Sequence, residues 1–125
     1  RVSRLRPLPR VSADPEQLTE VLVNIIVNAC EAMSRGGSIS ITESAEDHPL
    51  LKQVAVIRIR DSGPGIEAPV LAKVFQPFFS TKADGTGLGL SISQRIISEH
   101  RGRLEVDSTA GEGAEFIITL PLGDP

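Results

Sequence analysis

The chain has 125 residues, of which 40% are hydrophobic, and its formal net charge is −3. This length and apolar content predict a single domain, residues 1–125, with one hydrophobic core. The scattered Lys and Arg argue against a nucleic-acid partner, and no apolar run reaches the ~20 residues of a transmembrane helix.

Two features bear on the surroundings of the chain. The single Cys30 cannot form an internal disulfide and fits a reducing compartment, so we expect a cytoplasmic domain without direct membrane contact. Residues 1–10 carry four Arg and two Pro and no initiator Met, which indicates a piece cut from a longer protein. That parent could be membrane-anchored.

The first element is a helix with a clear start. Asp14 can cap it, Pro15 suits the first turn and Glu16 favours the positive end of the helix dipole. The pattern predicts a helix over residues 15–34, ended by the glycine pair at 36–37. Its core-facing residues recur at three- and four-residue steps and are Leu18, Val21, Leu22, Ile25, Ile26, Ala29 and Met33.

A hairpin is expected next. Residues 38–43 and 54–61 alternate between apolar and polar side chains, which predicts two strands with one solvated face each. The polar residues 44–53 predict the loop between them.

The second half of the chain predicts, in order, a short helix, a lid-like stretch, a longer helix and two strands, over residues 69–73, 74–87, 88–101, 103–108 and 114–120. The lid-like stretch is rich in Gly, Ser and Thr, so we expect it to be mobile. The whole pattern predicts a two-layer α/β sandwich, in which about three helices cover one face of a mixed, mostly antiparallel sheet of about five strands.

Three alternating glycines, Gly85, Gly87 and Gly89, run into the longer helix. A helix start exposes unpaired amides and the positive end of the dipole, and glycine lets the backbone approach a ligand, so this arrangement suits phosphate. Such clusters also occur as plain turns. No Gly-Lys-Ser/Thr follows and no strand precedes, which argues against a P-loop and a dinucleotide-binding turn. We therefore expect a third kind of nucleotide site.

Glu20, Asn24 and Asn28 lie four residues apart and form a polar ridge on the apolar first helix. Buried amides need partners, and an amide oxygen is a suitable ligand for magnesium. The ridge is either a functional pair of asparagines or a solvated or internally bonded face.

Asp61 follows Ile59 on the inward side of its strand, where a carboxylate requires a partner. It can accept a hydrogen bond from an exocyclic amine such as that of adenine, and Gly63 and Gly65 leave room for a base. Equally, Asp61 can start a turn by accepting from the next two backbone amides.

Phe75, Phe78 and Phe79 crowd the segment before Lys82. They either fill the core or dock a mobile loop that leaves Lys82 to meet phosphate. A lone lysine is otherwise a solvated charge.

Four linked motifs and a fifth segment resemble, in this order, the ATP-binding catalytic domain of sensor histidine kinases. That superfamily also holds DNA gyrase, heat-shock chaperone ATPases and mismatch-repair ATPases. The resemblance covers about residues 9–121. It comprises an asparagine box at 24–33 (NIIVNACEAM), a first glycine box at 61–66 (DSGPGI), a phenylalanine box at 75–82 (FQPFFSTK), a second glycine box at 85–90 (GTGLGL) and the usual start of the last strand at 111–116 (GEGAEF).

The resemblance implies a Bergerat-type fold that binds ATP and magnesium. It implies that Asn28 coordinates magnesium, that Asn24 supports the phosphate and metal site, and that Asp61 binds the adenine amine. Lys82, with Thr86, would serve the phosphates, and Asn24, Asn28 and Lys82 form the implied catalytic set. The implied remaining pocket residues are Gly63, Gly65, Ile66, Phe75, Gly85, Gly87, Leu88 and Gly89.

Asn24 bears on the reaction. The superfamily's ATPases place a Glu four residues before the metal-binding Asn as general base, and an amide cannot take a proton. An imidazole nucleophile needs little base help, so the resemblance favours transfer of the γ-phosphoryl group to a histidine. Neither His48 nor His100 has the expected setting. The implied partners are therefore ATP or ADP, a separate dimerisation and phosphoacceptor domain of the same protein, and a response regulator receiver domain.

Three alternatives remain. The chain could be a superfamily ATPase domain with switch-like closure, a non-catalytic nucleotide-sensing or partner-binding module, or a purely structural α/β domain. Steady hydrolysis marks the first, binding without transfer marks the second, and nucleotide binding excludes the third.

Overall fold

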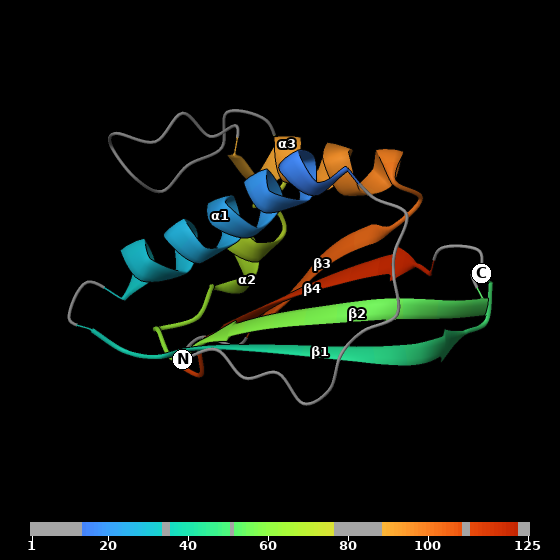
Figure 1. Cartoon of the computed structure of the whole chain (residues 1–125). Coiled ribbons are helices and arrows are strands. Elements are labelled where there is room, and N and C mark those ends of the chain that lie inside the picture. Colours follow the sequence, from blue (N-terminus) through green and yellow to red (C-terminus); the bar gives the residue numbers. More distant parts are fainter. Residues whose placement is uncertain (1–13, 34–35, 51, 77–88, 109–110, 123–125) are drawn as a thin grey trace.

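The computed structural model describes residues 14–33, 36–50, 52–76, 89–108 and 111–122. Its four strands form one sheet in the order β1-β2-β4-β3, in which each described pair is antiparallel (Figure 1). The described sheet thus has four strands rather than the expected five. The elements are α1 (Pro15–Ala32), β1 (Ile39–His48), β2 (Lys52–Asp61), α2 (Ala68–Leu71), α3 (Gly89–Glu99), β3 (Arg103–Ser108) and β4 (Ala114–Pro121).

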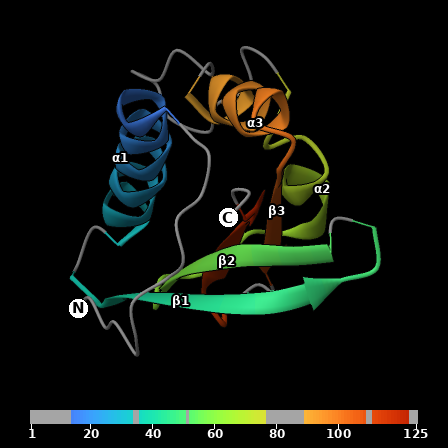
Figure 2. The same cartoon turned by 45° about the vertical axis from the view of Figure 1, so that its right-hand side comes forward.

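The helices and the sheet form two layers. Figure 2 shows α1 and α3 side by side over the same face of the sheet, with the short α2 on that face as well. This arrangement confirms the two-layer α/β sandwich, since both long helices bury an apolar stripe against one sheet face. Among the helices of the described ranges, none has the length and apolar character needed to cross a membrane.

The start of α1 is fixed by two contacts. Asp14 caps the helix as predicted, because its Oδ1 accepts a hydrogen bond from the amide of Glu16 at 2.9 Å. The Asp14 amide in turn donates to Nε2 of His100 at 3.0 Å, while Nδ1 of that ring lies 2.7 Å from the carbonyl oxygen of Ile96. A neutral imidazole with its proton on Nδ1 satisfies both contacts and ties α1 to the end of α3.

The β1–β2 hairpin is longer than the sequence predicts. Residues 44–53 were expected to be a loop, but β1 extends to His48, which pairs with Lys52. In this antiparallel ladder the backbone groups of β1 that face β2 find partners there, so polar residues join the strand despite their low strand propensity. Arg58 supports the pairing from the far sheet face through an ion pair of 3.5 Å with Glu46.

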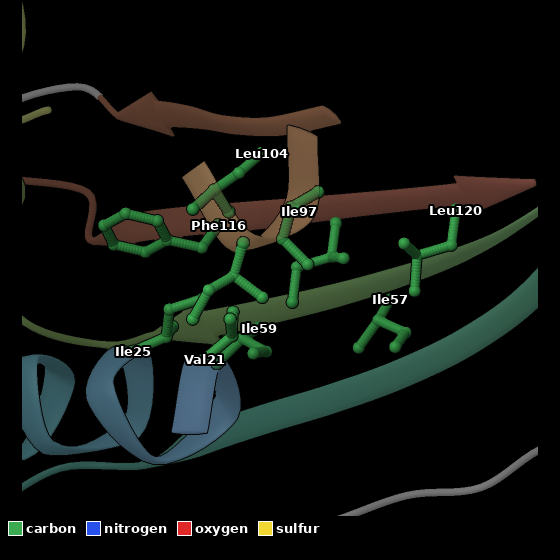
Figure 3. Close-up of a cluster of buried hydrophobic side chains, with 10 residues drawn as sticks. Val21, Ile25, Ile57, Ile59, Ile97, Leu104, Phe116 and Leu120 are labelled. Carbon is green, nitrogen blue, oxygen red and sulfur yellow. The ribbon is translucent and has the colours of Figure 1, made fainter. Parts of the chain in front are cut away.

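The core lies between the helices and the sheet (Figure 3). Inward residues of β2 and β4 pair directly, as in Ile57 with Ile118 and Ile59 with Phe116. These residues meet the buried side of each long helix, so one cluster joins both layers. It consists of Val21, Ile25, Ile57, Ile59, Ile96, Ile97, Leu104, Phe116, Ile118 and Leu120.

Two valines of α1 test the contribution of this core to stability. Val21 is fully buried, whereas Val23 is 52% exposed. Val21→Ala removes two buried carbons and leaves a cavity, so we expect it to lower the free energy of unfolding by about 2–3 kcal/mol in urea titration. Val23→Ala is the control and should change it little, because alanine favours the helix and little apolar burial is lost. Equal losses for both variants would contradict the assigned packing.

Candidate functional site

Asp61 lies at the end of β2 with its carboxylate turned toward the helices. The residue is 7% exposed and sits on the same face as buried Ile59, as predicted. Its Oδ1 accepts hydrogen bonds from the amides of Gly63 at 2.8 Å and Ala114 at 3.3 Å. The turn interpretation is therefore also correct in part, but the amide from β4 adds a contact between segments that no local pattern reveals.

Gly113 brings the start of β4 against the backbone of Asp61. Its φ is +83°, and a Cβ at this position would overlap the backbone oxygen of Asp61. Glycine is therefore required here both for its conformation and for the close approach. Sequence reasoning did not count Gly113 as a site residue, although the Gly-x-Gly pattern at 111–113 was the available signal.

Ser108 joins the loop after β2 to the turn between β3 and β4. Its Oγ accepts from the amide of Ile66 at 2.8 Å and donates to the carbonyl of Gly113 at 2.8 Å. The Gly111 amide also donates to the carbonyl of Pro64. Sequence reasoning missed Ser108 because a serine at the end of a strand carries no local signal of such a role.

Asn24 forms a polar bridge between α1 and α3. Its Nδ2 lies 3.3 Å from Oγ of Ser93 and 3.5 Å from the carbonyl oxygen of Gly89, so it donates to both groups. Ser93 is fully buried, and its polarity on an otherwise apolar helix face was the signal that could have found it. The internally bonded interpretation therefore holds for the Asn24 amide, and that bonding places Asn24 beside the last glycine of the second glycine box.

Asn28 and Phe75 complete the described part of the expected site. Asn28 is half-buried, one turn after Asn24 on α1. The ring of Phe75 meets that of Phe116 edge to face, with centroids 6.4 Å apart and an interplanar angle of 82°. Core filling is therefore confirmed for Phe75.

Several expected site residues have no described position. Of the predicted lid at 74–87, only the first three residues are described, and Val74 among them is buried. The residues of the expected site and its lid that lie outside the described ranges are Phe78, Phe79, Lys82, Gly85, Thr86, Gly87 and Leu88.

The described part of the expected site consists of two groups of contacts. The buried carboxylate and the glycine loop after it lie at the end of β2, and the polar bridge joins α1 to the start of α3. The family described as histidine kinase-, DNA gyrase B-, and HSP90-like ATPase matches residues 13–124. The chain belongs to this ATPase family.

Relatives of this ATPase-family domain include the sensor histidine kinase ZraS of Salmonella typhimurium. It is 46% identical over 117 residues, which cover 92% of this chain and 24% of ZraS. Sporulation kinase C of Bacillus subtilis is 43% identical over 113 residues, which cover 90% of this chain and 25% of that kinase. The chain thus spans about a quarter of the length of these relatives.

Solved structures share the fold. The catalytic domain of the histidine kinase ThkA superposes with a TM-score of 0.74 at 35% identity, over 96% of this chain and 77% of ThkA's. Full-length ShkA in complex with AMPPNP superposes with a TM-score of 0.83 at 31% identity, over 99% of this chain and 25% of the ShkA chain. The fold is therefore that of histidine kinase catalytic domains.

Two glycines of the β3–β4 turn test the close approach at Asp61. Gly111 and Gly113 have φ of +85° and +83°, but an added Cβ meets no atom within 4 Å at Gly111. Both alanine variants carry the same backbone strain, and only Gly113→Ala also overlaps Asp61. We expect Gly113→Ala to cost about 1–3 kcal/mol more than Gly111→Ala in thermal or urea unfolding. Equal losses of stability in the two variants would show that Gly113 does not lie in close contact with the backbone of Asp61.

Proposed function

We propose that this domain binds magnesium ATP and donates its γ-phosphoryl group to a histidine on a separate dimerisation and phosphoacceptor domain, in two-component signal transduction. The observation that carries this proposal is the buried Asp61 carboxylate, fixed at one oxygen beside a glycine loop. Two backbone amides offset the cost of burying this carboxylate at one oxygen and leave the other as an acceptor for a ligand, which favours a recognition role.

Asp61 is proposed to recognise adenine. Two amides converge on Oδ1 and fix the orientation of the carboxylate. Oδ2 is then the oxygen that would accept a hydrogen bond from the adenine amine, and the negative charge strengthens that bond. Gly63, Gly65 and Ile66 follow directly and would line the base.

Asn28 is proposed to hold magnesium. Magnesium prefers hard oxygen ligands and commonly takes one or two from protein while phosphates and water supply the others. The half-buried Asn28 amide provides such an oxygen on the helix that also carries Asn24. The described residues contain no cluster of three or more His, Cys, Asp or Glu for a metal, and a magnesium ion bound through phosphates needs none. The bound ion would neutralise phosphate charge.

The phosphates are proposed to lie near the start of α3. Asn24 binds the carbonyl of Gly89, the first residue of that helix, and so sets the helix start against α1. The amides of the first turn favour anions, and Gly85, Gly87, Leu88, Lys82 and Thr86 precede them in sequence. We propose that Lys82 and Thr86 contact the phosphates and that residues 74–87 include the ATP lid.

Asn24 favours a kinase over an ATPase. The Asn24 amide donates to Ser93 and Gly89, and an amide cannot accept the proton that a general base must take. Transfer to a histidine instead needs alignment: the imidazole nitrogen attacks the γ-phosphorus, the bond to the bridging oxygen breaks and ADP leaves.

The acceptor histidine is proposed to lie elsewhere in a longer sensor kinase. His100 uses both ring nitrogens to join α1 and α3, and Nδ1 of His48 accepts from the amide of Leu50 at 3.1 Å. We therefore propose that residues 1–125 form one catalytic domain, and that the parent supplies the phosphoacceptor domain and meets a response regulator receiver domain. We further propose that the domain acts in the cytoplasm, whether or not the parent is membrane-anchored.

Asp61→Asn tests adenine recognition. If the oxygen of the new Asn side chain keeps the hydrogen bonds from the two backbone amides, its NH₂ group would face the adenine amine, so that one donor would meet another. We expect calorimetry with AMPPNP and magnesium to show at least about tenfold weaker binding. The control is Asp107→Asn, which makes the same charge change at an exposed position of β3. Unchanged binding by Asp61→Asn would contradict the assigned role.

Phosphoryl transfer tests the reaction itself. With radiolabelled ATP and magnesium, we expect the domain to label the parent's phosphoacceptor domain with an acid-labile, alkali-stable phosphate, while the domain alone hydrolyses ATP slowly. Asn28→Ala should lose the labelling, and Val27→Ala, an exposed neighbour on α1, should keep it.

Other outcomes would select a different function. Steady magnesium-dependent hydrolysis by the domain alone would favour the ATPase. Nucleotide binding without transfer would favour a sensing module, and no binding would favour a structural domain.

A further inference from the structure

We infer that Ser108 is a positioning residue for nucleotide selection, acting on Asp61 through the Gly113–Ala114 peptide. This inference rests on the proposed function of Asp61 in binding adenine. Ser108 itself is the last residue of β3 and pairs with Ala114 across the β3–β4 ladder.

A single peptide unit carries the connection. The carbonyl of Gly113 accepts a hydrogen bond from Oγ of Ser108 at 2.8 Å. The other end of the same peptide plane is the Ala114 amide, which donates to Oδ1 of Asp61 at 3.3 Å. Because the peptide is planar, fixing its carbonyl fixes the direction of its N–H. Ser108 therefore sets the aim of one of the two donors that orient the carboxylate.

The Ser108 hydroxyl also holds the loop that follows β2. Its oxygen accepts from the amide of Ile66 at 2.8 Å, in the loop that follows Asp61. The hydroxyl thus uses a donor and an acceptor function at once, and bonds in such a chain strengthen one another. A second link between the turn and this loop, from the Gly111 amide to the Pro64 carbonyl, does not involve the hydroxyl. Loss of the hydroxyl should therefore loosen the site without detaching the loop.

The position of these bonds predicts a selective effect. Ser108 acts at Asp61 and Ile66, whereas the proposed magnesium and phosphate groups lie on α1 and near the start of α3. Ser108→Ala should consequently weaken recognition of the base amine while leaving the phosphate contacts in place. A merely structural role would weaken binding of all nucleotides alike.

The test compares two nucleotides on the 125-residue chain. ATP and purine riboside triphosphate differ only at C6, where the latter has hydrogen in place of the amine. The measured quantity is the ratio of their dissociation constants with magnesium. We expect the wild type to favour ATP, and Ser108→Ala to lower that preference by about three- to tenfold. Ser40→Ala, an exposed serine of β1, is the matched control and should keep the wild-type ratio.

The outcomes separate this inference from the proposed function. A wild type that binds neither nucleotide, or both equally, would overturn the proposed role of Asp61 and this inference with it. A selective wild type with an unchanged ratio in Ser108→Ala would overturn the inference alone. Ser108→Thr retains the hydroxyl and provides a second variant, for which we expect a ratio within about twofold of the wild type. If Ser108→Thr lost the preference for ATP although it keeps a hydroxyl, that result would also contradict the inference.

Discussion

The antiparallel pairing of β2 with β4 is the constraint on which the candidate site depends. Their register places Ile59 opposite Phe116 and ends at Arg60 and Glu115. One residue further, the Ala114 amide donates to the side chain of Asp61 and not to the backbone of β2. The apolar pairs fix this register because a one-residue slip would turn their side chains away from the core. The core of the sheet therefore sets the position of the carboxylate.

A second polar contact has a similar origin. Asn24 and Ser93 face each other between α1 and α3, in a layer whose other contacts are largely apolar. Burying these groups is tolerable because each satisfies the other, and the pairing specifies how the two helices align. The alignment brings Gly89 to Asn24, so helix packing and the proposed phosphate region are parts of one arrangement. Contacts that stabilise the fold therefore also set the geometry of the candidate site, both at Asp61 and at Asn24.

Periodicity predicted most of the fold because it reports which side of an element is apolar. The cap at Asp14, the buried positions Val21, Ile25 and Ala29 of α1 and the inward side of Asp61 all follow from local spacing and were confirmed. The helix expected over 15–34 ends at Ala32, so Met33 is its C-cap and not a core position. The loop expected at 44–53 was wrong, since cross-strand pairing extends β1 to His48 and local propensity does not contain the partner strand. The described sheet has four strands rather than the expected five, and these are the four strands that alternation predicts along the chain.

The sequence by itself determined the order and character of the elements, and its motifs indicated the ATPase family. It also determined that Asp61 faces inward, because alternation along a strand fixes the side of each residue. Only the tertiary structure decided what meets that carboxylate, namely the Ala114 amide and, through the Gly113 peptide, Ser108. The contact between Ala114 and Asp61 joins residues 53 positions apart. The geometry of these contacts comes from the packing of two hairpins and two helices into one core, which no local pattern encodes.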